Sequence, residues 1–161
     1  MTKQVFSHFK LQGEWAELLF MARAAELGLS IVRPWGDSSP YDLALVCPEK
    51  ACPEKACPDA QLQRPSILRV QVKSTLQTAK HKNGPRGAYL CNTISRGPGG
   101  KVRTYSPAEV DFFALFVIPL DLWYIVPLAQ LRPVPYALLL DTTRPGNRYF
   151  KYLEAWHLLR S

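Results

Sequence analysis

The chain lacks a long apolar run and has few residues of the kinds that build disulfide or zinc scaffolds. A membrane-spanning helix needs about 18 or more consecutive apolar residues, and the longest candidate here, residues 112–120, is followed directly by Asp121. Residues 1–4 lack the apolar stretch of a secretory signal. These absences predict a soluble, cytoplasmic protein. The 161 residues, 47% of them hydrophobic, suffice for a single globular domain with its own core.

The four cysteines and three histidines predict little chemistry. Cys47, Cys52 and Cys57 recur because the peptide Cys-Pro-Glu-Lys-Ala is written twice and then begun again. Zinc sites usually use cysteine pairs two to four residues apart, with a second pair or histidines elsewhere. We therefore expect a duplicated loop insertion at about 47–59, and we expect Cys91 to be a buried or unreactive thiol. The histidines form no triad with a candidate nucleophile, which disfavours Ser/His or Cys/His catalysis.

Acidic residues are absent between Gln61 and Ala108, although this interval holds nine basic residues. The rest of the chain has eleven basic and thirteen acidic residues, so the whole excess behind the net charge of +7 lies in the middle third. Such a basic interval could form a surface that attracts a polyanion. The alternative interpretation is that it forms a solvated basic loop with no ligand. We expect the DNA-binding cations to be Lys80, Lys82, Arg86, Arg96, Lys101 and Arg103.

Hydrophobic periodicity predicts an α/β fold. Residues 9–29 have the spacing of a helix that ends at Gly28, and residues 149–159 have the spacing of a closing helix. Strands are expected over residues 30–33, 41–47, 67–74, 88–94, 110–118, 122–126 and 137–140. Trp15, Trp123 and Trp156 lie on apolar patterns and are expected in the core, whereas Trp35 beside Gly36 is expected to be exposed.

Two strand patterns carry the residues that suggest chemistry. Asp42 lies at the start of one strand pattern, and Gln71 and Lys73 lie near the end of the next. Strand alternation places Gln71 and Lys73 on the face opposite Val70 and Val72. A carboxylate, an amide oxygen and the carbonyl oxygen of Val72 suit Mg²⁺, with Mn²⁺ as a substitute. Lys73 is placed to hold a water or a phosphate. The arrangement is typical of a phosphodiester-cleaving nuclease.

The first helix offers two acids of different placement. Leu11, Trp15, Leu18, Leu19, Ala22 and Ala25 are taken as its buried stripe. Glu14 then lies at the edge of that stripe, where it could orient the site or ligate the metal, and Glu17 points to water. The alternative for Glu14 is an ion pair with a neighbouring cation. Asp37 is expected in a turn. Asp111 is expected to hold a loop by hydrogen bonding rather than to catalyse.

Pro40-Tyr41-Asp42 followed by Gln71-Val72-Lys73 resembles the PD-(D/E)xK nuclease superfamily in its Gln-for-Glu form. More narrowly, the chain resembles the PD-(D/E)xK endonucleases associated with bacterial group I introns, over roughly residues 8 to 140. The matching segments are 13–14, 26–29, 34–37, 41–43, 70–74, 109–113 and 124–127.

The resemblance implies a restriction-endonuclease-like core, a central mixed β-sheet flanked by helices, that cleaves double-stranded DNA with Mg²⁺. It also implies a homo-oligomer, a dimer or tetramer. Asp42, Gln71 and Lys73 become the catalytic core and Glu14 the helix acid. Two alternatives stay open: a non-catalytic DNA-binding protein on the same scaffold, and a nuclease that resolves DNA junctions. The Cys-Pro-Glu-Lys-Ala insertion and Gln71 are departures from the family pattern.

Overall fold

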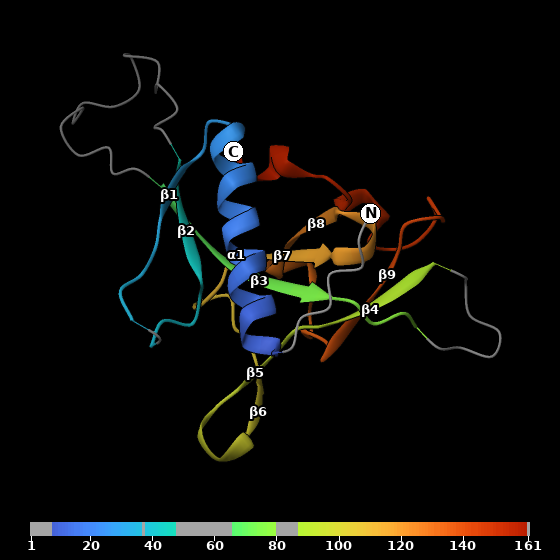
Figure 1. Ribbon diagram of the computed structural model, residues 1–161, viewed down its shortest axis with the longest axis horizontal. Coiled ribbons are helices and arrows are strands. Elements are labelled where there is room, and N and C mark those ends of the chain that lie inside the picture. The colour runs from blue at the N-terminus through green and yellow to red at the C-terminus, as the bar shows by residue number, and fades with distance from the viewer. Residues whose placement is uncertain (1–7, 37, 48–65, 80–86, 161) are drawn as a thin grey trace.

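The computed structural model describes residues 8–36, 38–47, 66–79 and 87–160 (Figure 1). The sequence insertion at about 47–59, apart from Cys47, lies outside these ranges, as do Asp37, Lys80, Lys82 and Arg86. In chain order, the helix and strands are α1 (Phe9–Glu26), β1 (Ser30–Val32), β2 (Leu43–Cys47), β3 (Ser66–Thr75), β4 (Ala88–Asn92), β5 (Ile94–Arg96), β6 (Val102–Thr104), β7 (Phe112–Val117), β8 (Leu122–Pro127) and β9 (Ala137–Asp141).

Five strands form the central sheet in the order β1-β2-β3-β7-β8. Only β3 and β7 run parallel among these neighbours, with Val70 opposite Phe112 and Thr75 opposite Val117. Parallel strands need a long crossover connection, and the chain between them contains β4, β5 and β6. The mixed sheet and its covering helix confirm the predicted α/β class.

Helix α1 lies across one face of this sheet (Figure 1). It buries Ala16, Phe20 and Ala24 completely, at a four-residue spacing that keeps one line of side chains on the sheet. The two alanines let the helix backbone approach closely, and Phe20 fills the space between them. Its ring packs edge-on against Trp123, with the ring centroids 5.6 Å apart. The helix ends before Gly28, whose φ of 74° is a left-handed conformation that glycine adopts without strain.

The opposite face of the sheet is covered by a two-stranded ribbon of β4 and β9. Its core includes Phe113, Leu115 and Tyr124, all fully buried. Because β7 and β8 are covered on both faces, their sequences are nearly continuous apolar runs rather than alternating ones. Cys91 on β4 is buried in this second core, as expected.

The C-terminal segment does not form the closing helix predicted over residues 149–159. Two 3₁₀ turns, Phe150–Tyr152 and Trp156–Arg160, take its place. Glu154 between them has a φ of 50° and bonds to Trp123 through both backbone and side chain: its N–H donates to the Trp123 carbonyl at 2.8 Å, and its carboxylate accepts the Trp123 N–H at 2.6 Å. The prediction is wrong because pairing with the exposed edge of β8 outweighs the local helical spacing.

A short hairpin of β5 and β6 extends away from the sheet beyond the N-terminal end of α1 (Figure 1). Its tip contains Gly99 and Gly100, both at positive φ. The basic, glycine-rich segment 96–100 therefore forms the end of a paired ribbon. Within the described ranges, no helix is both long and apolar enough to span a membrane.

Candidate active site at the fork of β2 and β3

The site lies where β2 and β3 separate. The two strands pair from Cys47 opposite Ser66 to Leu43 opposite Val70, and β3 then continues alone on this side to Thr75. Asp42 precedes the last pair, and its own N–H donates to the Val70 carbonyl at 3.1 Å. Its carboxylate reaches past the end of β2 and accepts the Val72 N–H at 2.8 Å. Asp42 thus replaces the strand partner that β3 loses at the fork.

Three oxygen or amide groups converge on this point. The Gln71 side-chain nitrogen lies 2.5 Å from Asp42 Oδ2 and 3.5 Å from the Val72 carbonyl oxygen. The N–H and the C=O of one strand residue point to the same side, so the Val72 carbonyl faces the fork beside the Asp42 carboxylate. The structure therefore brings together the Asp42, Gln71 and Val72 groups that the sequence singled out.

Burial raises the pKa of the Asp42 carboxyl, although the Val72 N–H, Lys73, Gln71 and Arg33 all act to lower it. A half-buried carboxylate of this kind is best stabilised by a positive charge placed directly against it. Its neighbour Gln71 is 6% exposed and neutral, so it supplies hydrogen bonding without a compensating charge. The electrostatics of the fork favour a bound cation.

The donor set fits a hard divalent cation better than a zinc ion. Asp42 and Val72 offer oxygens that face one point, and rotation of the Gln71 amide would present its oxygen to that point as well. Mg²⁺ takes such oxygens, usually with only one or two carboxylates. Among the described residues, no cluster of three or more His, Cys, Asp or Glu side chains is placed to hold a metal.

Lys73 is held on the same face of β3 as Gln71. Their register partners on β7, Phe113 for Gln71 and Leu115 for Lys73, belong to the second core, so both side chains point away from α1. The Lys73 ammonium lies over the ring of Tyr105, 5.4 Å from its centroid, where the ring quadrupole attracts it. Within the described part of the chain Lys73 has no salt bridge to a carboxylate. Its charge remains available to the site.

Of the two helix acids, Glu17 is the one that interacts electrostatically with Asp42, and the half-buried placement predicted for Glu14 is wrong. The Glu14 side chain is 50% exposed and lies 3.9 Å from the Lys10 ammonium, the ion pair considered as its alternative. The Glu17 side chain is 19% exposed and 2.9 Å from Arg33. Burial and then the Asp42 charge raise the pKa of Glu17, while Arg33 and Lys73 oppose that shift. Glu17 therefore shares the electrostatic field of Asp42 and Lys73.

The chain is similar to known endonucleases. A family of PD-(D/E)XK endonucleases matches residues 62–159, which include Gln71 and Lys73. This chain belongs to the PD-(D/E)XK endonuclease family. Among solved structures it is similar to a bacterial homing endonuclease, I-Ssp6803I, at 26% sequence identity and a TM-score of 0.69, over 96% of this chain and 94% of that chain. The comparison with curated proteins finds no match.

In this PD-(D/E)XK chain, a salt bridge between Arg69 and Asp111 joins β3 to the start of β7. Asp111 accepts the Arg69 backbone N–H at 2.8 Å, and its two carboxylate oxygens accept guanidinium N–H groups at 2.9 Å each. Burial acts to raise the pKa of Asp111, but the Arg69 hydrogen bonds outweigh it and lower the pKa. Arg69 also donates to the backbone carbonyls of Pro107 and Ala108. The expectation that Asp111 holds a loop is confirmed.

The same loop positions Tyr105 against Lys73. Glu109 accepts the Ser106 N–H at 3.0 Å and a guanidinium N–H of Arg103 at 2.6 Å. These contacts fix the segment that follows Tyr105, whose ring is 6% exposed and packs edge-on against Phe113. Sequence reasoning missed Glu17, Tyr105 and Arg33. Only the four-residue spacing of Ala16, Phe20 and Ala24, with Glu17 beside it, carried a signal for any of them.

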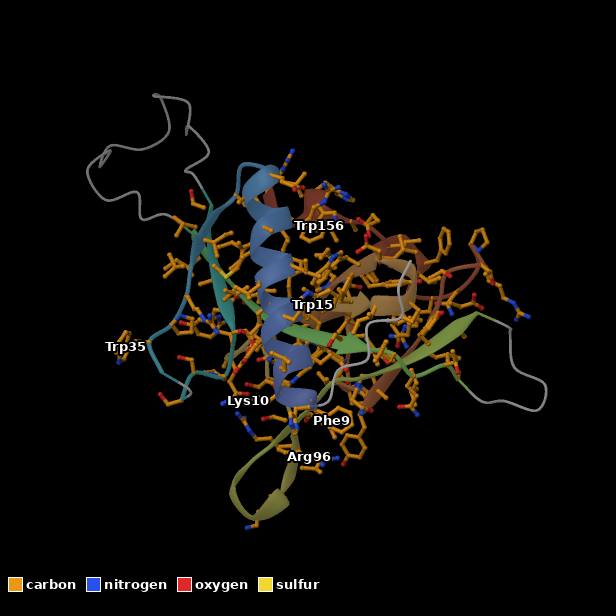
Figure 2. The ribbon with its side chains drawn as sticks, viewed as in Figure 1. Phe9, Lys10, Trp15, Trp35, Arg96 and Trp156 are labelled. Carbon is orange, nitrogen blue, oxygen red and sulfur yellow. The ribbon has the colours of Figure 1, made fainter. Side chains whose placement is uncertain are left out.

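The predicted DNA-binding cations divide into two groups in the described chain. Arg96 and Lys101 on the β5–β6 hairpin are exposed, and no described carboxylate forms an ion pair with either. Figure 2 shows Arg96 beyond the N-terminal end of α1, the end that carries Phe9 and Lys10. Arg103 on the same hairpin is bound to Glu109. The hairpin therefore offers two unpaired cations at its tip, and its base is tied to the loop behind Lys73.

Proposed function

We propose that this protein is a Mg²⁺-dependent endonuclease that hydrolyses phosphodiester bonds of double-stranded DNA. The observation that carries the proposal is the convergence of the Asp42 carboxylate, the Val72 carbonyl and the Gln71 amide at the strand fork, with the Lys73 ammonium on the next outward-facing position of β3. Family membership supports an endonuclease, and the similar homing endonuclease supports DNA as the substrate.

Each residue at the fork has a distinct role in this proposal. Asp42, Gln71 and Val72 would hold the metal, which would supply an activated water and charge neutralisation at the phosphate. Lys73 orients the attacking water and stabilises the negative charge that develops on the phosphoryl oxygens. A new bond forms from the water oxygen to phosphorus while the bond from phosphorus to the leaving sugar oxygen breaks. Tyr105 holds Lys73 in place through its ring face.

The DNA backbone contacts come from the exposed cations of the β5–β6 hairpin, Arg96 and Lys101, together with the predicted contacts Lys80, Lys82 and Arg86. Phosphate contacts of this kind make affinity fall steeply with salt. One fork supplies one metal site, which cuts one strand. Cleavage of both strands in one binding event would use a homo-oligomer, a dimer or tetramer, that presents two forks to the duplex.

Plasmid nicking tests the proposal. Supercoiled plasmid incubated with the protein and Mg²⁺ should convert to nicked or linear product, and EDTA should abolish the conversion. Mn²⁺ should substitute for Mg²⁺. Salt-sensitive DNA binding without any Mg²⁺ binding by calorimetry would instead show a non-catalytic DNA-binding protein. A non-catalytic DNA-binding protein is the second candidate function, because residue 71 is a glutamine. Asp42 is then the only carboxylate in direct contact with the described fork residues.

Glu17 and Glu14 form a matched pair for testing which helix acid supports the metal. Because Glu17 lies in the field of Asp42, Glu17→Gln should raise the Mg²⁺ concentration for half-maximal nicking about tenfold, a typical cost of losing a supporting group around a metal ligand. Glu14→Gln removes the same charge from an exposed ion pair and should shift it by less than about twofold. Equal shifts for the two variants would contradict the assignment.

A further inference from the structure

Trp35 is 99% exposed, whereas the other three tryptophans are packed. Trp123 and Trp156 are each 5% exposed, and the Trp15 ring lies 5.6 Å from that of Phe116. Burying an indole removes roughly 150–250 Å² from water and is strongly stabilising. A tryptophan left fully in water contributes nothing to the described fold, so its side chain is free to contact a ligand. Figure 2 shows the Trp35 ring pointing away from the body of the protein.

Trp35 lies on the β1–β2 connection, at the end of the sheet where the fork is. Val32 at the end of β1 pairs with Ala44 on β2, so the β1–β2 connection leaves the sheet at the same end at which Asp42 enters it. Arg33, two residues before Trp35, is bound to Glu17 and acts on the pKa of Asp42. Chain geometry and strand spacing keep the Trp35 backbone within about 20 Å of the Asp42 backbone.

The surroundings of Trp35 suit insertion better than a protein interface. Gly36 has a φ of 74°, and no atom lies within 4 Å of where a Cβ would be built on it. The next described residues, Ser38 and Ser39, are small and polar. A stable contact with a second copy of the chain buries at least about 1,000 Å² in total, several times what one indole offers. A single ring on a small, polar loop instead matches a side chain that stacks on a nucleic-acid base.

We propose that Trp35 stacks on a base of bound DNA, at a base step opened close to the bond that is cut. At about 3.4 Å per base pair, the backbone span together with the reach of the two side chains limits the contacted base to within about one helical turn of the scissile phosphate. The inference rests on the proposed function for its ligand, but it concerns binding alone. It can be tested without metal and without cleavage.

The test uses tryptophan fluorescence of the full chain in EDTA, titrated with linear plasmid DNA. DNA should protect the exposed component of the emission from acrylamide, and salt should reverse that protection. Trp35→Phe keeps Trp15, Trp123 and Trp156, so its emission should show no DNA-dependent protection while its DNA affinity stays near that of the parent. Trp35→Ala should bind DNA about tenfold or more weakly, as expected for loss of one base–aromatic stack, and should unfold at the same temperature as the parent.

A duplex that contains a mismatched pair provides a second measurement, because its bases unstack at lower cost. The parent should prefer it over the matched duplex, and Trp35→Ala should lose that preference. DNA binding that leaves Trp35 fully accessible to acrylamide, with unchanged affinity in Trp35→Ala, would overturn the inference and leave the nuclease proposal standing. Protection that rises with protein concentration in the absence of DNA would also overturn it, by showing that a second copy covers the ring. Absence of any DNA binding would refute both proposals.

Discussion

Replacing Asp42 with asparagine is expected to reduce Mg²⁺-dependent nicking by about 10³-fold, equivalent to about 4 kcal/mol of transition-state stabilisation. In the parent, the Val72 nitrogen lies 2.8 Å from Asp42 Oδ2. Asparagine keeps a side-chain oxygen that can accept the same N–H. The fork is therefore expected to keep its structure while it loses the carboxylate charge that is proposed to bind the metal. Calorimetry should show weaker Mg²⁺ binding, and salt-sensitive DNA binding in EDTA should be retained.

Asp121→Asn is the matched control for this substitution. Asp121 is an exposed residue at φ 54° in the turn between β7 and β8, a conformation that asparagine tolerates well. The control makes the same chemical change at the surface and should nick plasmid at the parent rate. Parental activity in Asp42→Asn would show that the fork is not the catalytic centre, whatever other activity the protein has.

The elements around the fork could be predicted because their patterns are local. Strand alternation assigned Gln71 and Lys73 to one face, and the structure pairs them with Phe113 and Leu115 of the second core. A carboxylate at the start of one strand and a polar-x-lysine sequence late in the next also indicated residues that the structure brings together, since Asp42, Gln71 and Val72 meet at the fork. The antiparallel register brings these groups together, and register follows from which residues must be buried.

The rotation of α1 could not be predicted because both of its faces carry apolar side chains. Leu11 and Leu18 were assigned to the buried stripe, yet they are 52% and 58% exposed. The sheet instead receives Ala16, Phe20 and Ala24, since small residues allow close packing around one large ring. This rotation exchanges the predicted exposure of the two helix acids, so that the Glu17 side chain is 19% exposed and the Glu14 side chain 50% exposed. The error arises because tertiary packing decides which of the two apolar patterns on the helix faces the sheet.

The other missed features depend on partners distant in the sequence. Tyr105 contacts Lys73 from the segment before β7, which the Arg69–Asp111 salt bridge ties to β3. The C-terminal turns form because Glu154 bonds to Trp123, 31 residues earlier. Such contacts are decided by where β7 and β8 lie in the sheet. A sequence read segment by segment contains the residues but not their pairing.

Lys73→Met is expected to lower the nicking rate by about 10²- to 10³-fold, the range measured when one preorganised donor to a developing anion is removed. Methionine preserves much of the lysine's aliphatic length, so the variant can still pack against the ring of Tyr105, which now lies 5.4 Å from the ammonium. Because Lys73 is proposed to act on the water and phosphate rather than on the metal, Mg²⁺ binding should remain within about twofold of the parent. Single-turnover nicking at saturating Mg²⁺ measures the difference.

Lys151→Met is the control for the loss of a lysine charge over a tyrosine ring. The Lys151 ammonium lies 5.0 Å from the centroid of the Tyr152 ring, in the C-terminal 3₁₀ turn. Lys151→Met makes the same chemical change as Lys73→Met, but on an element that contributes no group to the fork. The nicking rate of Lys151→Met should therefore match that of the parent. If both variants lost activity equally, the effect would come from net charge and DNA affinity. A loss confined to Lys73→Met, with DNA affinity in EDTA nearly unchanged, places the lysine charge at the reacting phosphate.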